Sequence, residues 1–136
     1  MGIRGAVCAL AAIAAIAAGC GGADEVETRA IHGTFTFPAT TNLVGVRSCD
    51  GSGGYSDIHR GAQATLTDAE GTIVSTTRIG NGTHGGSAHC TFPFTFLPIE
   101  VESGFYSVEI SRRGKITKSV AELDADEWTF ELSLGL

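Results

Sequence analysis

The four cysteines are the residues whose chemistry the sequence constrains most tightly. Cys8 lies inside an apolar run, Cys20 follows at its end, and Cys49 and Cys90 stand apart in the body of the chain. No two cysteines are separated by two residues, so their spacing does not fit a four-cysteine zinc site. In an exported protein a disulfide persists, and we expect Cys49 and Cys90 to be joined. Closing that loop would stabilise the domain by roughly 4 kcal/mol in the chain-entropy model.

A second group of side chains could hold a ligand if the two cysteine-bearing loops meet. It consists of three histidines and two aspartates from the loops 49–61 and 80–89: Asp50, Asp57, His59, His84 and His89. Imidazoles and carboxylates are common metal ligands, but these histidines lack the short regular spacings of a metal site. We therefore interpret them as exposed loop residues, with the segment 81–86 mobile. Ligand binding by Asp50, Asp57, His59 and His89 is the alternative.

The glycine-rich loop at residues 50–57 resembles a calcium or phosphate loop only in composition. An EF-hand has glycine at its sixth position and glutamate at its twelfth, where this chain has Tyr55 and Gly61. The glycines of this loop lack the Lys-Ser or Lys-Thr ending of a phosphate loop, and the sequence has no Gly-x-Ser-x-Gly motif of an α/β-type serine hydrolase. We therefore expect a structural loop, no cofactor or metal, and no enzymatic activity.

Residues 1–19 are interpreted as a signal peptide rather than as part of the fold. Arg4 supplies a positive charge, and residues 5–18 are uncharged, a run shorter than the roughly 20 residues that span a bilayer. The Ala-Ala-Gly-Cys at 17–20 resembles the lipobox of bacterial lipoproteins, in which the cysteine becomes the lipidated N-terminus. Cys20 is thus the expected lipidation site. Ordinary cleavage after Ala17 is the alternative and would leave Cys20 as a free thiol.

Residues 20–30 are then a lipidated cysteine with an acidic tether, and residues 31–136 form one domain. Apolar residues make up 43% of the chain, enough for a packed core. Alternation of polar and apolar residues predicts half-buried strands at 34–37, 62–67, 72–75, 90–96, 106–110, 116–118 and 128–134. Ser119 and Glu122 suggest one capped helix turn. Seven to eight short strands predict an all-β, two-sheet antiparallel β-sandwich, immunoglobulin-like or transthyretin-like, with one disulfide.

Large aromatic side chains should supply much of the core between the two sheets. The alternating stretches place the following on inward faces: Phe35, Phe37, Phe92, Phe94, Phe96, Trp128 and Phe130. Pro93, on the opposite face of its stretch, suggests an edge strand or a bulge.

The charge balance excludes some classes of partner. The formal net charge is −6, which argues against general binding to nucleic acid and against electrostatic adhesion to anionic lipid. The basic residues that cluster in sequence are Arg112, Arg113, Lys115 and Lys118. We interpret them as a solvated face of a hairpin that also protects a sheet edge.

The segment Cys-x-Gly-x-Gly-Gly-Tyr-x-Asp-Ile at 49–58, with the later Cys-x-Phe-Pro-Phe at 90–94, resembles a family of small secreted proteins and lipoproteins from actinobacteria. Residues 105–109 and the turn at Arg113-Gly114 also look like that family, and the likeness covers about residues 32–135. This family has no established function to carry over. A looser similarity in strand pattern is to transthyretin-like and carboxypeptidase-regulatory β-sandwich domains.

These features together predict a lipoprotein held at the extracytoplasmic face of the cell membrane by its N-terminal lipid. We expect it to act as a non-enzymatic interaction or structural module, with the bilayer and an unidentified envelope protein or surface as partners, and no nucleic acid. The alternative is a small-ligand or metal-binding lipoprotein that uses the loops 49–61 and 80–89.

Replacing Cys20 tests the anchor directly. Wild-type protein should partition into detergent and have an intact mass that corresponds to a diacylglycerol-bearing chain beginning at Cys20. Cys20→Ala should release the domain, because stable anchoring needs two or more acyl chains and this residue carries them. A Cys20→Ala protein that stays with the membrane as firmly as wild type would contradict lipidation.

Overall fold

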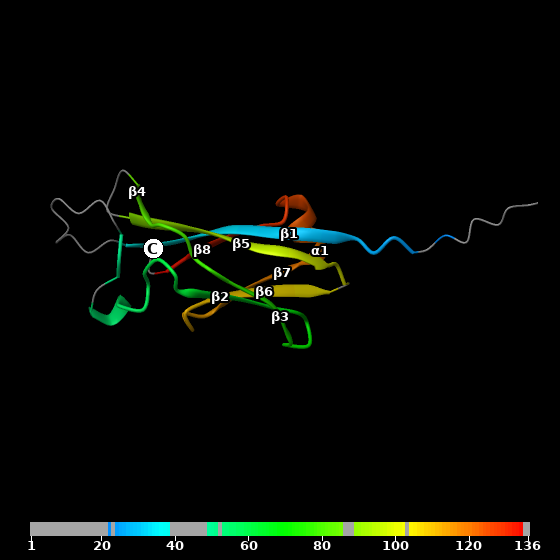
Figure 1. The fold of residues 1–136 in the computed structure, drawn as a ribbon, viewed down its shortest axis with the longest axis horizontal. Coiled ribbons are helices and arrows are strands. Elements are labelled where there is room, and N and C mark those ends of the chain that lie inside the picture. Colours follow the sequence, from blue (N-terminus) through cyan, green and yellow to red (C-terminus); the bar gives the residue numbers. More distant parts are fainter. Residues whose placement is uncertain are drawn as a thin grey trace, which may run out of the picture.

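The computed structural model describes residues 22, 24–38, 49–51, 53–85, 89–102 and 104–134. Cys20 and the predicted signal peptide lie outside them. The described residues form two layers of strands, with one 3-10 turn and one short helix (Figure 1). The strands are β1 (Thr28–Pro38), β2 (Gln63–Thr67), β3 (Ile73–Arg78), β4 (Thr83–Gly85), β5 (His89–Glu100), β6 (Phe105–Ile110), β7 (Lys115–Ser119) and β8 (Thr129–Ser133). The 3-10 turn is η1 (Gly53–Tyr55) and the helix is α1 (Val120–Ala125). None of the described helices is long and apolar enough to cross a membrane.

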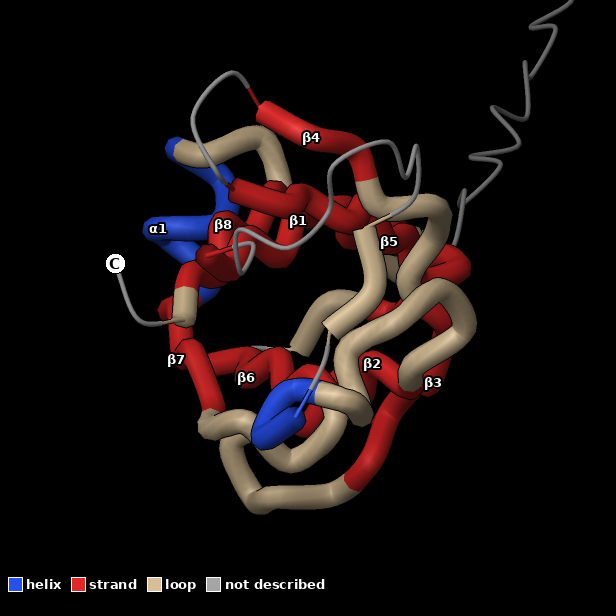
Figure 2. The backbone as a smooth tube through the Cα atoms, turned by 90° about the vertical axis from the view of Figure 1, so that its left-hand side faces the viewer, coloured by secondary structure: helices blue, strands red, loops and turns tan. Residues whose placement is uncertain are grey.

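Each layer is a sheet of four strands, as Figure 2 shows in a view along the molecule. One sheet has the order β4-β5-β1-β8 and the other β3-β2-β6-β7. The predicted all-β two-sheet sandwich with a Cys49–Cys90 disulfide is confirmed. One ladder departs from an antiparallel arrangement, because β8 pairs with β1 in parallel. The reason is α1, which carries the chain from the end of β7 into the first sheet at the end where β1 starts.

The core follows from the register of β1 against β5. Inward-facing residues of these strands are direct cross-strand partners: Ile31↔Phe96, Gly33↔Phe94, Phe35↔Phe92 and Phe37↔Cys90. A β-carbon on Gly33 would collide with the Phe94 ring and the Phe130 carbonyl, so glycine is needed where the ring crosses β1. All seven aromatic residues predicted for the core are buried. Such directly opposed apolar pairs are the unit by which a sheet is stabilised.

Three features of the strands differ from the prediction. Residues 83–85, expected to be mobile, form β4, because β5 extends back to His89 and offers them a partner. Strand β1 begins at Thr28, inside the predicted tether, since β5 continues to Glu100 opposite it. Trp128 is buried as expected but precedes β8, in a left-handed conformation (φ 57°), and its indole N–H donates to Asp124.

Pro93 lies in β5 beyond the last residue that pairs with β4, so β5 has no ladder on that side of Pro93. This is the edge position that a proline in a strand requires.

The side of the sandwich between β7 and β8 is linked by Lys118. Its ammonium donates to the Thr129 carbonyl at 2.9 Å, pairs with Asp126, and lies 5.6 Å from the centre of the Phe130 ring. The helix that follows begins with the predicted capping box of Ser119 and Glu122. Lys118 therefore links β7 of the second sheet to β8 of the first sheet, where no strand ladder joins them.

Phe130 and Phe105 make a matched pair for testing the core. Phe130 is fully buried and Phe105 is 53% exposed. Phe130→Ala should lower the free energy of unfolding by about 3–5 kcal/mol, the usual cost of truncating a buried aromatic residue. Phe105→Ala should cost less than about 1 kcal/mol by the same urea denaturation. Equal losses for the two variants would contradict the core assignment.

Candidate functional site

The sandwich is elongated, and its two ends lie far apart along the long axis (Figure 1). The tether end comprises residues 24–28, 68–72, 100–102 and 120–128, and the chain enters the fold there. The loop end comprises residues 49–51, 53–61, 79–85 and 111–114. Strand β1 runs between them, and its 11 residues span roughly 35 Å. Every residue proposed as a ligand from the sequence lies at the loop end or at its border with β5.

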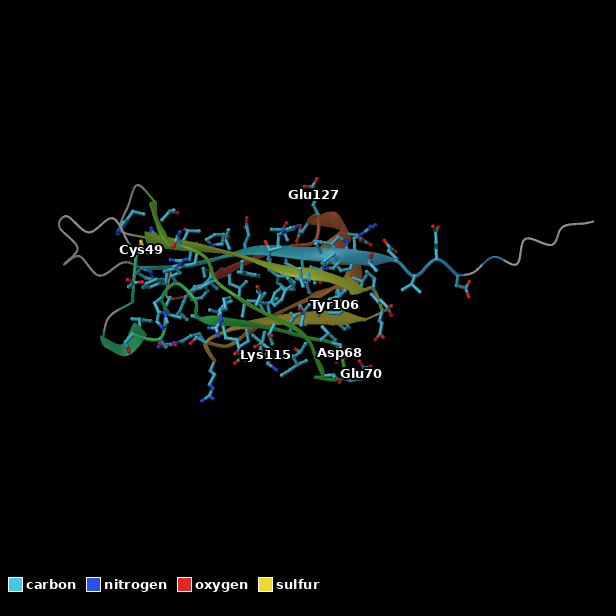
Figure 3. The ribbon with its side chains drawn as sticks, in the orientation of Figure 1. Cys49, Asp68, Glu70, Tyr106, Lys115 and Glu127 are labelled. Atoms are coloured by element: carbon cyan, nitrogen blue, oxygen red, sulfur yellow. A yellow bond between two sulfur atoms is a disulfide. The ribbon has the colours of Figure 1, made fainter. Side chains whose placement is uncertain are left out.

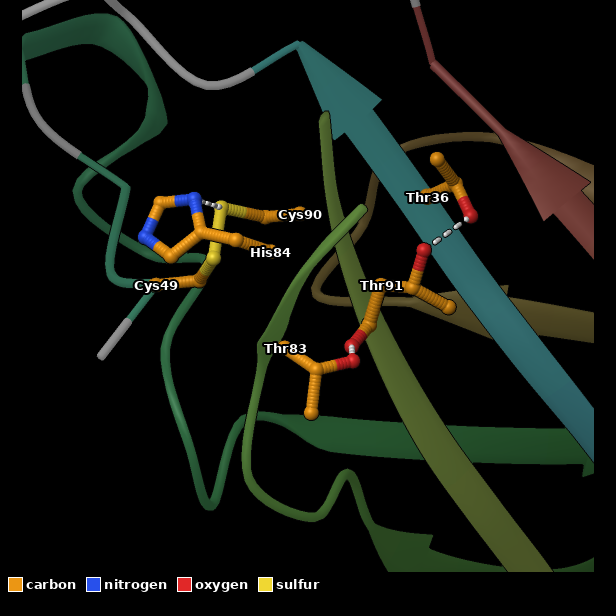
Figure 4. Close-up of a disulfide and its surroundings, with 6 residues drawn as sticks. All are labelled: Thr36, Cys49, Thr83, His84, Cys90 and Thr91. Carbon is orange, nitrogen blue, oxygen red and sulfur yellow. Dashed lines mark hydrogen bonds between the residues drawn. A yellow bond between two sulfur atoms is a disulfide. The ribbon is translucent and has the colours of Figure 1, made fainter. Parts of the chain in front are cut away.

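A disulfide attaches the loop end to the first sheet. Cys49 and Cys90 are both buried, with their Cα atoms 5.6 Å apart, well inside the reach of a disulfide. His84 is the cross-strand partner of Cys90, and its Nδ1 lies 4.0 Å from the Cys90 sulfur (Figure 4). Beside the disulfide, a β-carbon on Gly82 would lie 2.7 Å from the Cys49 β-carbon, so a larger residue would clash at this position.

An arginine attaches the same loop to the second sheet. Arg113, in the turn between β6 and β7, donates through Nε and Nη2 to the two carboxylate oxygens of Asp57 and also to the Gly54 carbonyl. Its guanidinium lies 5.2 Å from the centre of the Tyr55 ring, which in turn contacts Phe37 of the core. The Arg113 hydrogen bonds lower the pKa of Asp57 to about 2, and the pairing raises the pKa of Arg113. The loop is thus fixed to both layers.

The side chains proposed as ligands do not gather into one chelating set. Asp50 and His59 are exposed, Asp57 is bound to Arg113, and His89 is half-buried at the start of β5. Ligand binding by these four stays a prediction, with the loop location as its only support. Among the described residues, the group whose ligand atoms lie within 4.8 Å of one another is Cys49, His84 and Cys90. Sequence spacing did not point to that group, because β4 was not expected.

A shallow groove of about 500 Å³ runs along the outer face of the second sheet, from the loop end toward the start of β3. It is lined by Asp57, Gln63, Thr65, Ile73, Glu109, Ser111 and Arg112. Ser111 (φ 46°) and Arg112 (φ 64°) both adopt left-handed backbone conformations in a turn closed by the Arg113 amide on the Ile110 carbonyl. Such turns favour Asn-Gly, so Ser-Arg gave no signal in the sequence. The turn holds Arg112 at the groove.

Charge is separated along the long axis of the molecule. The described residues of the tether end contain no lysine or arginine of their own, although Arg29 and Lys118 of the adjoining strands pair with Glu27 and Asp126. The acidic residues of this end are Asp24, Glu25, Glu27, Asp68, Glu70, Glu100, Glu102, Glu122, Asp124, Asp126 and Glu127. Most lysines and arginines among the described residues lie at the loop end and its border, beside the acidic Asp50, Asp57 and Glu109: Arg60, Arg78, Arg112, Arg113 and Lys115. Figure 3 shows Asp68, Glu70 and Glu127 on the tether side of Lys115 and Cys49. The prediction that the basic residues 112–118 form a solvated face is wrong for Arg113 and Lys118, because both are ion-paired.

Comparison of the chain with protein-family models, with curated proteins and with solved structures finds no match.

The Asp57–Arg113 pair predicts a loss of stability in acid. The pKa of Asp57 is about 2 in the folded protein against 3.8 for an ordinary aspartate, so its contribution is present above about pH 4 and is lost as the pH falls to about 2. Because the Asp57 side chain is 35% exposed, we expect the contribution to be below about 1 kcal/mol. In urea denaturation, the free energy of unfolding of Asp57→Asn should therefore match that of wild type at about pH 2 and be lower than that of wild type at about pH 6.

The matched control is Asp50→Asn, which removes an exposed carboxylate from the same loop. A deficit of Asp57→Asn that is the same at both pH values, or that Asp50→Asn shares, would contradict the assignment.

Proposed function

We propose that this protein is an extracytoplasmic lipoprotein, anchored to the cell membrane through Cys20, that acts as a non-enzymatic interaction module. The loop end is the surface that meets the partner. The observation that carries the proposal is the separation of charge along the sandwich, with the tether at its acidic end.

The position of the tether supports an outward loop end. Seven residues separate Cys20 from Thr28, where β1 begins, so the Cα atoms of these two residues are at most about 28 Å apart when the segment is extended. The tether end is therefore the part of the domain nearest the bilayer. Its carboxylates are repelled by an anionic membrane surface over about a Debye length, 8 Å at physiological salt. Such a surface also attracts the cations of the loop end, so the outward direction of the loop end follows from the attachment of the tether at the opposite end and not from this repulsion.

The chemistry of the loop end favours a partner of negative charge. Arg60 and Arg112 are exposed or half-exposed there, and Arg78 borders them at the end of β3. The loop is held to both sheets, so it presents these groups with little ordering cost on binding. Electrostatic complementarity of this kind raises association rate and selects partners by charge.

The groove beside Arg112 supports the second candidate function, binding of a small ligand. Its lining is polar, with one apolar side chain from Ile73, and it offers one guanidinium, an amide, two hydroxyls and the carboxylates of Asp57 and Glu109 within about 500 Å³. Such a lining fits a small, hydroxyl-rich molecule. The loop-end surface and the groove overlap at Arg112, so both candidates predict that Arg112 contacts a partner.

Photo-crosslinking in intact cells distinguishes a loop-end interface from a tether-end one. A photoreactive phenylalanine analogue is placed at Arg112 in one chain and at Glu70 in another, both exposed or half-exposed sites in turns. Illumination should give discrete higher-mass adducts of the position-112 chain and not of the position-70 chain. Arg60→Glu in the same chain should weaken the position-112 adduct. Adducts from position 70 alone would contradict the proposal.

A further inference from the structure

We propose that Cys49, Cys90 and His84 form a metal site when their disulfide is reduced, with two thiolates and one imidazole holding a single thiophilic cation such as Zn²⁺. The proposal does not depend on the function assigned to the loop end. It adds a second chemical state to the same buried bond.

The three ligand atoms are already gathered. His84 Nδ1, Cys49 Sγ and Cys90 Sγ all lie within 4.8 Å of one another. In a tetrahedral zinc site, thiolate sulfurs and imidazole nitrogens lie about 3.7 Å apart. His84 Nδ1 and Cys90 Sγ, at 4.0 Å, are close to that value as they stand. The two sulfurs need to separate from bonding distance through rotation of the two cysteine side chains, whose Cα atoms are 5.6 Å apart.

Regular structure fixes two of the three ligands. His84 on β4 and Cys90 on β5 are direct cross-strand partners, so their side chains share one face of the sheet (Figure 4). Cys49 approaches from the other segment beside Gly82. The two ligands on paired strands keep their relative geometry when the covalent bond is gone. Cys49 then stays near them through the second attachment of its loop, the Arg113–Asp57 pair.

The oxidation states balance with a dithiol as the reductant. The dithiol attacks the Cys49–Cys90 bond, closes to its own disulfide, and leaves two thiols on this chain. A divalent cation then binds two thiolates and the neutral His84 imidazole, and two protons are released. Thiolate and imidazole ligands select Zn²⁺ or Cu⁺ over hard cations such as Mg²⁺.

Burial determines how the metal would arrive. Both cysteines are buried, whereas His84 is exposed. The imidazole is thus the solvent-facing member of the set, and the fourth coordination position lies on its side, open to water. A site with three protein ligands and an open position differs from closed structural zinc sites, which have four protein ligands.

Cobalt binding to the reduced chain tests the proposal. The full-length chain with Cys8→Ala and Cys20→Ala, in which Cys49 and Cys90 are the remaining thiols, is purified in detergent, reduced with dithiothreitol and desalted without air. Titration with Co²⁺ should produce a thiolate–cobalt charge-transfer band that saturates at one Co²⁺ per chain. Zn²⁺ should abolish this band, and the oxidised protein should not show it. His84→Ala should weaken Co²⁺ binding by at least about tenfold, since even outer-shell changes commonly cost that much. His59→Ala, a neighbouring exposed histidine, should bind as the parent does.

The fluorescence of Trp128 shows whether binding occurs in the folded protein. If the reduced chain stays folded, Zn²⁺ should raise its unfolding temperature in the parent and not in His84→Ala. If reduction unfolds the chain, Zn²⁺ should restore the buried emission of Trp128, as metal-coupled folding requires. The proposal is overturned by the absence of a charge-transfer band, by equal affinity of His84→Ala and His59→Ala, or by metal binding that leaves the chain unfolded.

Discussion

The Cys49–Cys90 disulfide is the constraint on which the loop end depends. Residues 49–61 contain one 3-10 turn and no strand among the residues that the structure describes, so backbone ladders do little to hold them. The disulfide ties one end of this segment to β5, and the Arg113–Asp57 pair ties its middle to the turn after β6. Removing the disulfide would leave the segment held mainly to the second sheet, into whose strand β2 it continues. The covalent link also contributes more to stability than the ion pair does, because an exposed ion pair stabilises by about 1 kcal/mol or less.

The rest of the sandwich holds itself together by burying alternate residues of β1 and β5. That core leaves the two ends free to diverge in chemistry, since neither contributes its charged residues to the interior. The tether end gathers carboxylates around the entry of the chain, whereas the loop end gathers cations, histidines and the disulfide. If such a domain is attached to a surface through its acidic end, the loop end stays accessible to partners. The proposed function draws on this division, whereas the proposed metal site depends on the pairing of β4 with β5.

Much of the fold followed from residue alternation, because each inward row is written into the sequence at period two. The aromatic core, the capping box at Ser119 and the disulfide were predicted from the sequence and are confirmed. The parallel pairing of β8 was not predictable, since alternation sets which face is buried and not which neighbour a strand takes. Strand β4 was missed because its three residues lie in a glycine-rich segment and gain strand structure only from β5.

The candidate site was less predictable than the fold, for a physical reason. Which histidine reaches the disulfide depends on the register of β4 against β5, and His84 rather than His89 faces Cys90 across the ladder. Likewise, the partner of Asp57 is Arg113, 56 residues away, and no local pattern relates them. The left-handed turn at Ser111 and Arg112 carries neither glycine nor asparagine at its centre, so its conformation is imposed by tertiary contacts.

The oxidation state of Cys49 and Cys90 in cells tests the central claim most directly. Free thiols are blocked with an alkylating agent in intact cells, the protein is isolated and digested, and the two cysteine peptides are measured with and without later reduction. The account predicts a linked Cys49–Cys90 peptide pair that carries no alkyl group until it is reduced. Alkylation of both cysteines in the intact cell, with no linked peptides, would contradict it.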